Sequence, residues 1–231
     1  MIEIKNITKT YNKETVLDID SLKIESGQTF GLVGNNGAGK TTLFSTLLDL
    51  IKPSTGSVSI DSINVRNNEN WKTFTSAYLD ESFLISYLMP EEYFYFIGEL
   101  RKISKNDIDI FLEQFSDLFN GEILGGKKYI RDLSKGNQKK VGIVGALIGS
   151  PKFIILDEPF ANLDPTTQIR LKKIIKNLSQ TKDVTVLVSS HDLQDLTEVS
   201  DRIVLLEKGL VIKDIKKTKK TLKDLESYFT K

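Results

Sequence analysis

The residues Gly34 to Thr41 have the types and the spacing needed to hold a phosphate chain. They read GNNGAGKT and match the pattern GxxxxGK[ST] at every fixed position. Glycines let the backbone approach a polyanion and adopt positive φ, so that successive N–H groups can surround it. Lys40 would reach the terminal phosphates, and the hydroxyl of Thr41 would hold Mg²⁺. The sequence therefore predicts a site for ATP with Mg²⁺.

A strand before this loop and a helix after it must position these residues. Thr29–Val33 is a short apolar run, typical of a strand covered on both faces. The following helix is expected to continue through about Leu50, and its N-terminus adds partial positive charge to the anion site. We assign to the nucleotide the residues Asn35, Asn36, Gly37, Ala38, Gly39, Lys40, Thr41 and Thr42.

Two carboxylates follow a second apolar run, Phe153–Leu156. In parallel α/β sheets, ligands lie beyond the carboxyl ends of the strands. Asp157 is therefore expected beside the phosphates, where it could hold Mg²⁺ through water, and Glu158 could polarise the attacking water as a general base. An acidic turn after a core strand is the alternative interpretation, and the phosphate loop in the same chain favours the catalytic one.

The segment Leu133–Gln138 reads LSKGNQ and resembles the signature sequence LSGGQ of ABC (ATP-binding cassette) ATPases. It lies just upstream of the acidic strand, as in that family, and the resemblance covers nearly the whole chain. It implies hydrolysis of ATP to ADP and phosphate. It also implies a head-to-tail dimer in which Ser134 and Gly136 contact the ATP held by a second subunit. From the residues alone, Ser134 is expected to cap a helix.

The resemblance gives roles to further residues. Tyr11 is similar to the aromatic residue that stacks on adenine, with Val16 beside it, although packing is the alternative for a tyrosine near a strand end. Asp164 corresponds to the loop that crosses the dimer interface, and it can also cap the helix expected over Pro165–Gln180. His191, the only histidine, resembles the switch histidine that contacts the γ-phosphate and positions water; a surface role is the alternative.

The sequence departs from the family pattern at two positions. Where the family has a glutamine that reaches the metal, this chain has Glu81, with Asp80 as the competing assignment. A carboxylate is a good ligand for Mg²⁺. Lys135 replaces the first glycine of the signature, a form that resembles exporters of the antibiotic-resistance and lantibiotic-immunity (ABC-2) type. The predicted metal ligands are Thr41, Glu81 and Asp157.

The order of strand and helix patterns predicts an α/β fold. We expect a P-loop NTPase core with an N-terminal antiparallel β subdomain and an inserted α-helical subdomain. The whole chain, 1–231, is expected to form one ABC ATPase domain. Its parts are the core with the antiparallel subdomain (1–81 and 151–215), the helical subdomain (82–150) and a lysine-rich tail (216–231).

Three helices are expected in the helical subdomain. Pro90 suits the first turn of one helix, a second fits residues 106–119, and a third begins near Ser134. Aromatic residues are frequent between residues 82 and 100, and Phe94, Phe96 and Ile97 could form a buried stripe. The resemblance implies that this region receives a helix of a membrane subunit.

The composition excludes several classes of protein. A formal net charge of +1 argues against a protein that grips nucleic acid by bulk charge, so no nucleic acid partner is expected. The absence of cysteine excludes disulfides and thiolate metal sites. No signal peptide and no apolar stretch of about 18 residues is visible. We expect a cytoplasmic chain, peripheral on the inner face of the cell membrane, whose membrane part is another chain.

Three functions remain open from the sequence. The first is an exporter subunit that pairs with a second copy of itself or a homologous cassette and with an integral membrane permease. The second is a non-transport ABC ATPase of the iron–sulfur assembly or cell-division type. The third is a non-hydrolysing regulator, which intact Lys40, Asp157, Glu158 and His191 argue against. We favour the first.

Overall fold

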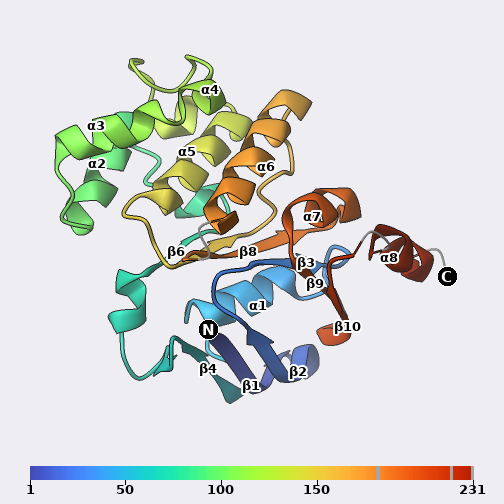
Figure 1. Cartoon of the computed structure of the whole chain (residues 1–231). Coiled ribbons are helices and arrows are strands. Elements are labelled where there is room, and N and C mark those ends of the chain that lie inside the picture. Colours follow the sequence, from blue (N-terminus) through green and yellow to red (C-terminus); the bar gives the residue numbers. More distant parts are fainter. Residues whose placement is uncertain (181–182, 219–220, 230–231) are drawn as a thin grey trace.

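The computed structural model describes residues 1–180, 183–218 and 221–229, and in this part of the chain helices surround two β-sheets (Figure 1). The strands are β1 (Ile2–Tyr11), β2 (Glu14–Ile24), β3 (Thr29–Val33), β4 (Thr55–Ile60), β5 (Ile63–Asn64), β6 (Thr75–Tyr78), β7 (Phe153–Leu156), β8 (Thr185–Ser190), β9 (Arg202–Glu207) and β10 (Leu210–Lys216). The α-helices are α1 (Lys40–Leu47), α2 (Pro90–Leu100), α3 (Lys105–Glu113), α4 (Ser116–Phe119), α5 (Lys135–Leu147), α6 (Pro165–Gln180), α7 (Leu193–Val199) and α8 (Thr221–Phe229). Short 3₁₀-helices are η1 (Asn70–Thr73), η2 (Glu81–Phe83) and η3 (Ile130–Asp132).

The larger sheet positions the loops that carry the predicted chemistry. Its strand order is β10-β9-β3-β8-β7-β6, and the strands from β9 to β6 run parallel. Both faces are covered: on β7, Ile155 packs with the cluster around α1, whereas Ile154 packs with the helical subdomain. Because the strands are parallel, the loops that follow β3, β7 and β8 leave the same edge of the sheet.

The smaller sheet is antiparallel, with strand order β2-β1-β4-β5. The turn between β1 and β2 has positive φ at Asn12 (46°) and Lys13 (72°), the conformation that suits a two-residue hairpin turn. Ile2 and Ile4 of β1 are fully buried. Helix α1 fills the space between the two sheets, where Phe44 is fully buried (Figure 1).

The helical subdomain lies on the other side of the larger sheet (Figure 1). Helix α5 is its centre, since every residue from Gln138 to Leu147 is buried, as expected for a helix surrounded by other elements. On α2, Phe94 stacks on Phe119 of α4, with ring centroids 5.9 Å apart. The predicted helix starts at Pro90 and next to Ser134 are confirmed.

The single helix predicted over residues 106–119 is wrong, because the segment forms α3 and α4 with a break between them. At the break, the N–H groups of Gln114 and Phe115 bond to carbonyls three residues back, at 3.3 and 3.0 Å. This tighter winding turns Phe115 inward, where its ring centroid lies 4.9 Å from that of Phe111. Core packing therefore breaks a segment that is locally helix-prone.

Two smaller expectations also fail. The stripe of Phe94, Phe96 and Ile97 is not all buried: Phe94 is fully buried, but Phe96 is 40% exposed. Residues two apart on a helix point to different faces, so both cannot enter the same core. Helix α1 ends at Leu47 rather than near Leu50, because Asp49 adopts a positive φ of 52°. None of the helices in the described residues has the length and apolar character needed to cross a membrane.

The close contact between α5 and β6 predicts a sensitivity at Gly142. A Cβ atom at this position would lie 2.3 Å from Cε2 of the buried Tyr78 ring. We expect Gly142→Ala to lower the free energy of unfolding by about 1–3 kcal/mol, although alanine favours a helix by about 1 kcal/mol. Urea denaturation measures the change. Gly126→Ala is the control, because its Cβ would meet no atom within 4 Å; equal stability of the two variants would contradict the prediction.

Candidate functional site

The phosphate loop connects β3 to α1 and is held from two sides. Gly39 has φ 104°, and a Cβ there would lie 2.8 Å from the carbonyl oxygen of Val16 on β2, so only glycine fits. On the other side, the N–H of Gly209, in the turn between β9 and β10, donates to the Ala38 carbonyl at 2.9 Å. These contacts leave the loop's outer residues, Asn35, Asn36 and Gly37, exposed, with Thr42 half-buried in the first turn of α1.

Lys40 lies between the loop and the acidic strand end. Its Nζ donates to the Gly34 carbonyl at 2.6 Å and lies 3.1 Å from Oε1 of Glu158. The side chain is only 5% exposed. A cation at this place can neutralise both the terminal phosphates of a nucleotide and the Glu158 carboxylate.

Asp157 directly follows β7 as a buried carboxylate that accepts hydrogen bonds from two hydroxyls. Thr41 Oγ1 donates to one carboxylate oxygen at 2.5 Å, and Ser189 Oγ on β8 donates to the other. Burial raises the pKa of Asp157, while the two hydroxyls and Lys40 oppose this shift. The structure therefore brings together the predicted metal residues Thr41 and Asp157.

Glu158 and His191 form a direct pair. His191 Nδ1 lies 2.8 Å from Oε2 of Glu158, and the imidazole is half-exposed just after β8. Glu158 adopts φ 45°, a left-handed conformation that is strained for a side chain of this size. Its N–H donates to Ser189 Oγ at 2.9 Å. A carboxylate that faces both a histidine and Lys40 has the geometry of a general base held in one orientation.

The two acids after β6 point in different directions. Glu81 accepts a hydrogen bond from the Tyr78 hydroxyl at 2.8 Å, whereas Asp80 is exposed and caps the N–H of Ser82 at 2.6 Å. Burial, followed by the hydrogen bond to Glu81, raises the pKa of Tyr78. No hydrogen bond in the described residues joins Glu81 to Thr41 or Asp157, so its role as a metal ligand stays a prediction.

Tyr11 and Val16 lie on the hairpin beside the loop. Tyr11 is the last residue of β1 and is 45% exposed, and Lys9 Nζ lies 4.5 Å from its ring centroid. Val16 lies on β2, with its carbonyl against Gly39. An exposed ring at this edge is free to stack on a base, which fits the predicted role without testing it.

The remaining predicted residues are Ser134, Gly136 and Asp164. They line a second pocket of about 500 Å³ that is separate from the phosphate loop. Ser134 caps α5 and accepts from the Asn137 N–H at 3.2 Å. Asp164 caps α6 through the N–H and hydroxyl of Thr167, at 3.0 and 2.5 Å, and these bonds lower its pKa. The cap predicted for Asp164 is thus present. The lining of this pocket also includes Glu122, Lys140 and Arg170.

Two residues of the site were not singled out from the sequence. Ser189 bonds to Asp157 and to the Glu158 N–H, and the available signal was a hydroxyl residue just before His191 at a strand end. Lys139 donates to the carbonyls of Glu158 and Ala161. No local pattern marks Lys139, because its partners lie about 20 residues further along the chain.

A phosphate loop at a helix N-terminus, a buried aspartate and a glutamate–histidine pair together define a P-loop nucleoside triphosphatase. A family model described as ABC transporter matches residues 17–161. Over 214 residues the chain is 33% identical to an uncharacterised ABC transporter ATP-binding protein of Methanocaldococcus jannaschii, covering 91% of this chain and 76% of the relative.

Other comparisons agree with this. The bacitracin transport ATP-binding protein BcrA of Enterococcus faecalis is 29% identical, covering 93% of this chain and 69% of the relative. A methionine import ATP-binding protein of Carboxydothermus hydrogenoformans is 28% identical, with 93% and 66% covered. The solved dimeric structure of a bacterial ABC transporter cassette superposes with a TM-score of 0.83 at 25% identity, covering 94% of this chain and 99% of that chain.

The chain belongs to the ABC transporter family, as an ATP-binding subunit with ATPase activity. The predicted family and the predicted fold class are confirmed.

The buried carboxylate predicts a conflict between stability and activity. The pKa of Asp157 is higher in the folded chain than its unfolded value of 3.8. Ionisation of Asp157 therefore lowers the free energy of unfolding as the pH rises above 3.8. The full decrease is reached once the pH exceeds the pKa of the folded chain. Asp157→Asn should therefore increase the free energy of unfolding more at pH 7.5 than at about pH 3.5, which lies below the unfolded value, while ATP hydrolysis falls by about 10²-fold or more.

Thermal and urea unfolding at the two pH values, with steady-state hydrolysis assays, measure both effects. Asp20→Asn, on the exposed side of β2, is the control and should change neither quantity. A destabilised Asp157→Asn protein at pH 7.5 would show that the carboxylate stabilises the fold.

Proposed function

We propose that this chain hydrolyses ATP-Mg²⁺ at the interface of a head-to-tail dimer and thereby drives a separate membrane permease in the direction of export. One observation carries the dimer. Lys40, Asp157 and Glu158 lie together, whereas Ser134 and Asp164 line a pocket that contains no residue of the phosphate loop. If both groups act on one ATP, a second subunit must supply the second group.

The chemistry of the second pocket supports a phosphate ligand. Its residues include the N-cap Ser134 of a 13-residue helix and the cations Lys140 and Arg170. A helix N-terminus favours anions, and Lys140 is 6% exposed, so its charge is poorly screened by solvent. Glu122 and Asp164 line the same pocket. Both carboxylates already accept hydrogen bonds, from Asn137 and Thr167, within the chain.

Mg²⁺ fits the residues at the strand end. No cluster of three or more His, Asp or Glu residues suited to a metal is present in the described part of the chain. Mg²⁺ commonly takes one or two carboxylates and completes its shell with water and substrate phosphates. Thr41 and Asp157 would hold the ion, with Glu81 as the further predicted ligand. When bound, the ion would neutralise charge on the phosphates.

Hydrolysis would then depend on how the chain's own residues orient water. Glu158 would accept hydrogen bonding from the attacking water, and His191, 2.8 Å from its carboxylate, would restrict its orientation. Lys40 would exchange its contact with the Gly34 carbonyl for the terminal phosphates. Positioning and electrostatics supply most of the rate enhancement in phosphoryl transfer. Small displacements of Glu158 would therefore lower the rate of hydrolysis strongly.

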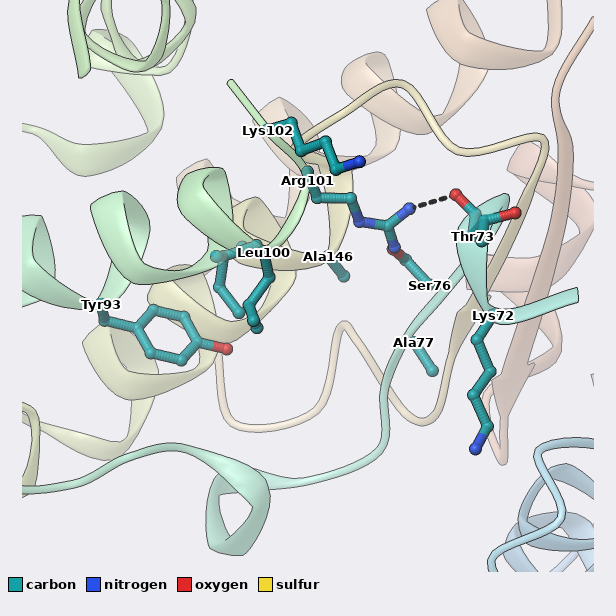
Figure 2. A pocket seen from close by; sticks show the side chains of 11 residues that line it. Lys72, Thr73, Ser76, Ala77, Tyr93, Leu100, Arg101, Lys102 and Ala146 are labelled. Carbon is teal, nitrogen blue, oxygen red and sulfur yellow. Dashed lines mark hydrogen bonds between the residues drawn. The ribbon is translucent and has the colours of Figure 1, made fainter. Parts of the chain in front are cut away.

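A surface groove between β6 and α2 supports a membrane partner (Figure 2). Its apolar side is formed by Tyr93 and Leu100, and Leu100 is 67% exposed. Arg101 lies at its basic side and donates to the carbonyls of Thr73 and Thr75, at 2.7 and 2.9 Å. Figure 2 shows the contact with Thr73. We propose that a cytoplasmic helix of the permease docks here, which would hold the chain at the inner face of the membrane.

Export is the favoured direction. It is supported by the LSKG form of the signature segment and by the relative named for bacitracin transport. Inverted membrane vesicles containing the whole transporter should accumulate its substrate when ATP is added, with bacitracin as the first compound to test. ATP-driven loss of substrate from such vesicles would establish import.

The dimer has a direct test in Glu158→Gln. This variant should bind ATP and sediment as a dimer at saturating ATP-Mg²⁺. Its rate of ATP hydrolysis should fall by about 10²-fold or more. Adding Lys40→Ala should abolish ATP binding and return the protein to the monomer. A Glu158→Gln protein that stays monomeric at saturating ATP-Mg²⁺ contradicts the shared site.

The permease has a separate test with the same variant. Glu158→Gln bound to ATP-Mg²⁺ should capture a multi-spanning membrane protein from detergent-solubilised native membranes, identified by mass spectrometry. Leu100→Asp should lose this protein, whereas Ile169→Asp, equally exposed on α6, should retain it. Recovery of soluble partners alone would place the chain with the non-transport ABC ATPases.

A further inference from the structure

Lys139 is a buried cation that the roles given above leave unexplained. It lies in the second turn of α5 and is 6% exposed. Its Nζ donates to the backbone carbonyls of Glu158 and Ala161, both at 2.9 Å. It forms no ion pair with a carboxylate among the described residues. Burying an ammonium group is unfavourable unless hydrogen bonds and opposite charge compensate. A buried lysine at this position therefore indicates that its hydrogen bonds have a role.

Nearby acidic residues offset part of the cost of burying the Lys139 ammonium group. Burial lowers the pKa of Lys139, whereas Glu81, Glu158 and Asp157 act in the opposite direction. These three acids surround the proposed reaction centre. Lys139 therefore belongs to the same group of charges as Lys40, although it approaches from the helical subdomain rather than from the phosphate loop.

The hydrogen bonds of Lys139 fix the backbone of a strained residue. Glu158 adopts φ 45°, and its N–H is held by Ser189 of β8 while its carbonyl is held by Lys139 of α5. The direction of a side chain follows the backbone dihedrals of its residue. Anchoring both sides of Glu158 thus sets where its carboxylate points, and strained conformations persist only when neighbouring contacts determine them.

The same helix carries the signature segment at its N-terminus. Ser134 caps α5, and Lys139 follows five residues later on a continuous helix. We propose that Lys139 is a positioning residue that ties the backbone of Glu158 to α5. Through this link, binding of a nucleotide at Ser134 would change the position of the Glu158 carboxylate. The communication rests on the dimer proposed above, whereas the hydrogen bonds to Glu158 and Ala161 belong to a single chain.

Lys139→Met tests the positioning role, because methionine has a similar length and no hydrogen-bond donor. We expect kcat for ATP to fall about tenfold or more while KM changes by less than about threefold, since the loss affects orientation rather than ATP binding. Lys139→Arg should restore most of kcat, because a guanidinium can donate to both carbonyls. Steady-state kinetics and urea unfolding are measured on the full chain.

Lys172→Met is the matched control. Lys172 is also well covered, with 11% side-chain exposure, but it contacts Asp195 and Glu198 at 2.8 and 3.0 Å, on α7. This variant should lose stability and keep its kcat. A wild-type kcat in Lys139→Met would overturn the proposal, as would a loss of kcat that Lys139→Arg does not restore. If Lys139→Met fails to fold, Lys139→Gln replaces it, with the same expectation of reduced kcat at unchanged KM.

A dimerisation assay separates this proposal from the shared site. In the Glu158→Gln background, Lys139→Met should still sediment as a dimer with ATP-Mg²⁺, because Ser134 and the phosphate loop are untouched. A monomer seen only when Lys139 is changed would overturn the positioning role and make Lys139 a dimer residue. A monomer seen in Glu158→Gln alone would reject the dimer, and the kcat of Lys139→Met would still decide the role within one chain.

Discussion

Two adjacent carboxylates held beside a binding site for a polyanion create an electrostatic conflict, and much of the structure serves to contain it. Asp157 is buried, which raises its pKa, and two hydroxyls stabilise its charged form. Glu158 is turned by its positive φ toward Lys40 and His191. The parallel sheet makes this arrangement possible, because β3, β7 and β8 deliver a cation, two acids, a hydroxyl and an imidazole to one edge.

Helix α5 connects this edge to the rest of the molecule. At its N-terminus it presents Ser134, in its second turn it reaches the Glu158 carbonyl through Lys139, and at Gly142 it packs against the ring of Tyr78. Tyr78 in turn bonds to Glu81. One helix thus touches the second pocket, the loop after β7 and the end of β6. A displacement of α5 cannot leave Glu158 and Glu81 unchanged, since protein interiors are close-packed.

Elements whose signal lies in neighbouring residues could be predicted from the sequence. The run Phe153–Leu156 and the helix Pro165–Gln180 were predicted with the bounds that they have, and the phosphate loop followed from its glycines and flanking elements. The break between α3 and α4, the exposure of Phe96, the hydrogen bond of Glu81 to Tyr78 and the contacts of Ser189 and Lys139 could not be predicted. Each depends on a partner brought close only by the tertiary fold.

The presence of one histidine in the chain has a practical consequence. A proton NMR spectrum of this chain should contain a single set of imidazole ring signals, from a group 2.8 Å from the Glu158 carboxylate. Selective isotope labelling of histidine alone would therefore give an assigned spectroscopic probe beside Glu158. Such a probe would report a change in the surroundings of Glu158 when nucleotide binds, without any engineered residue.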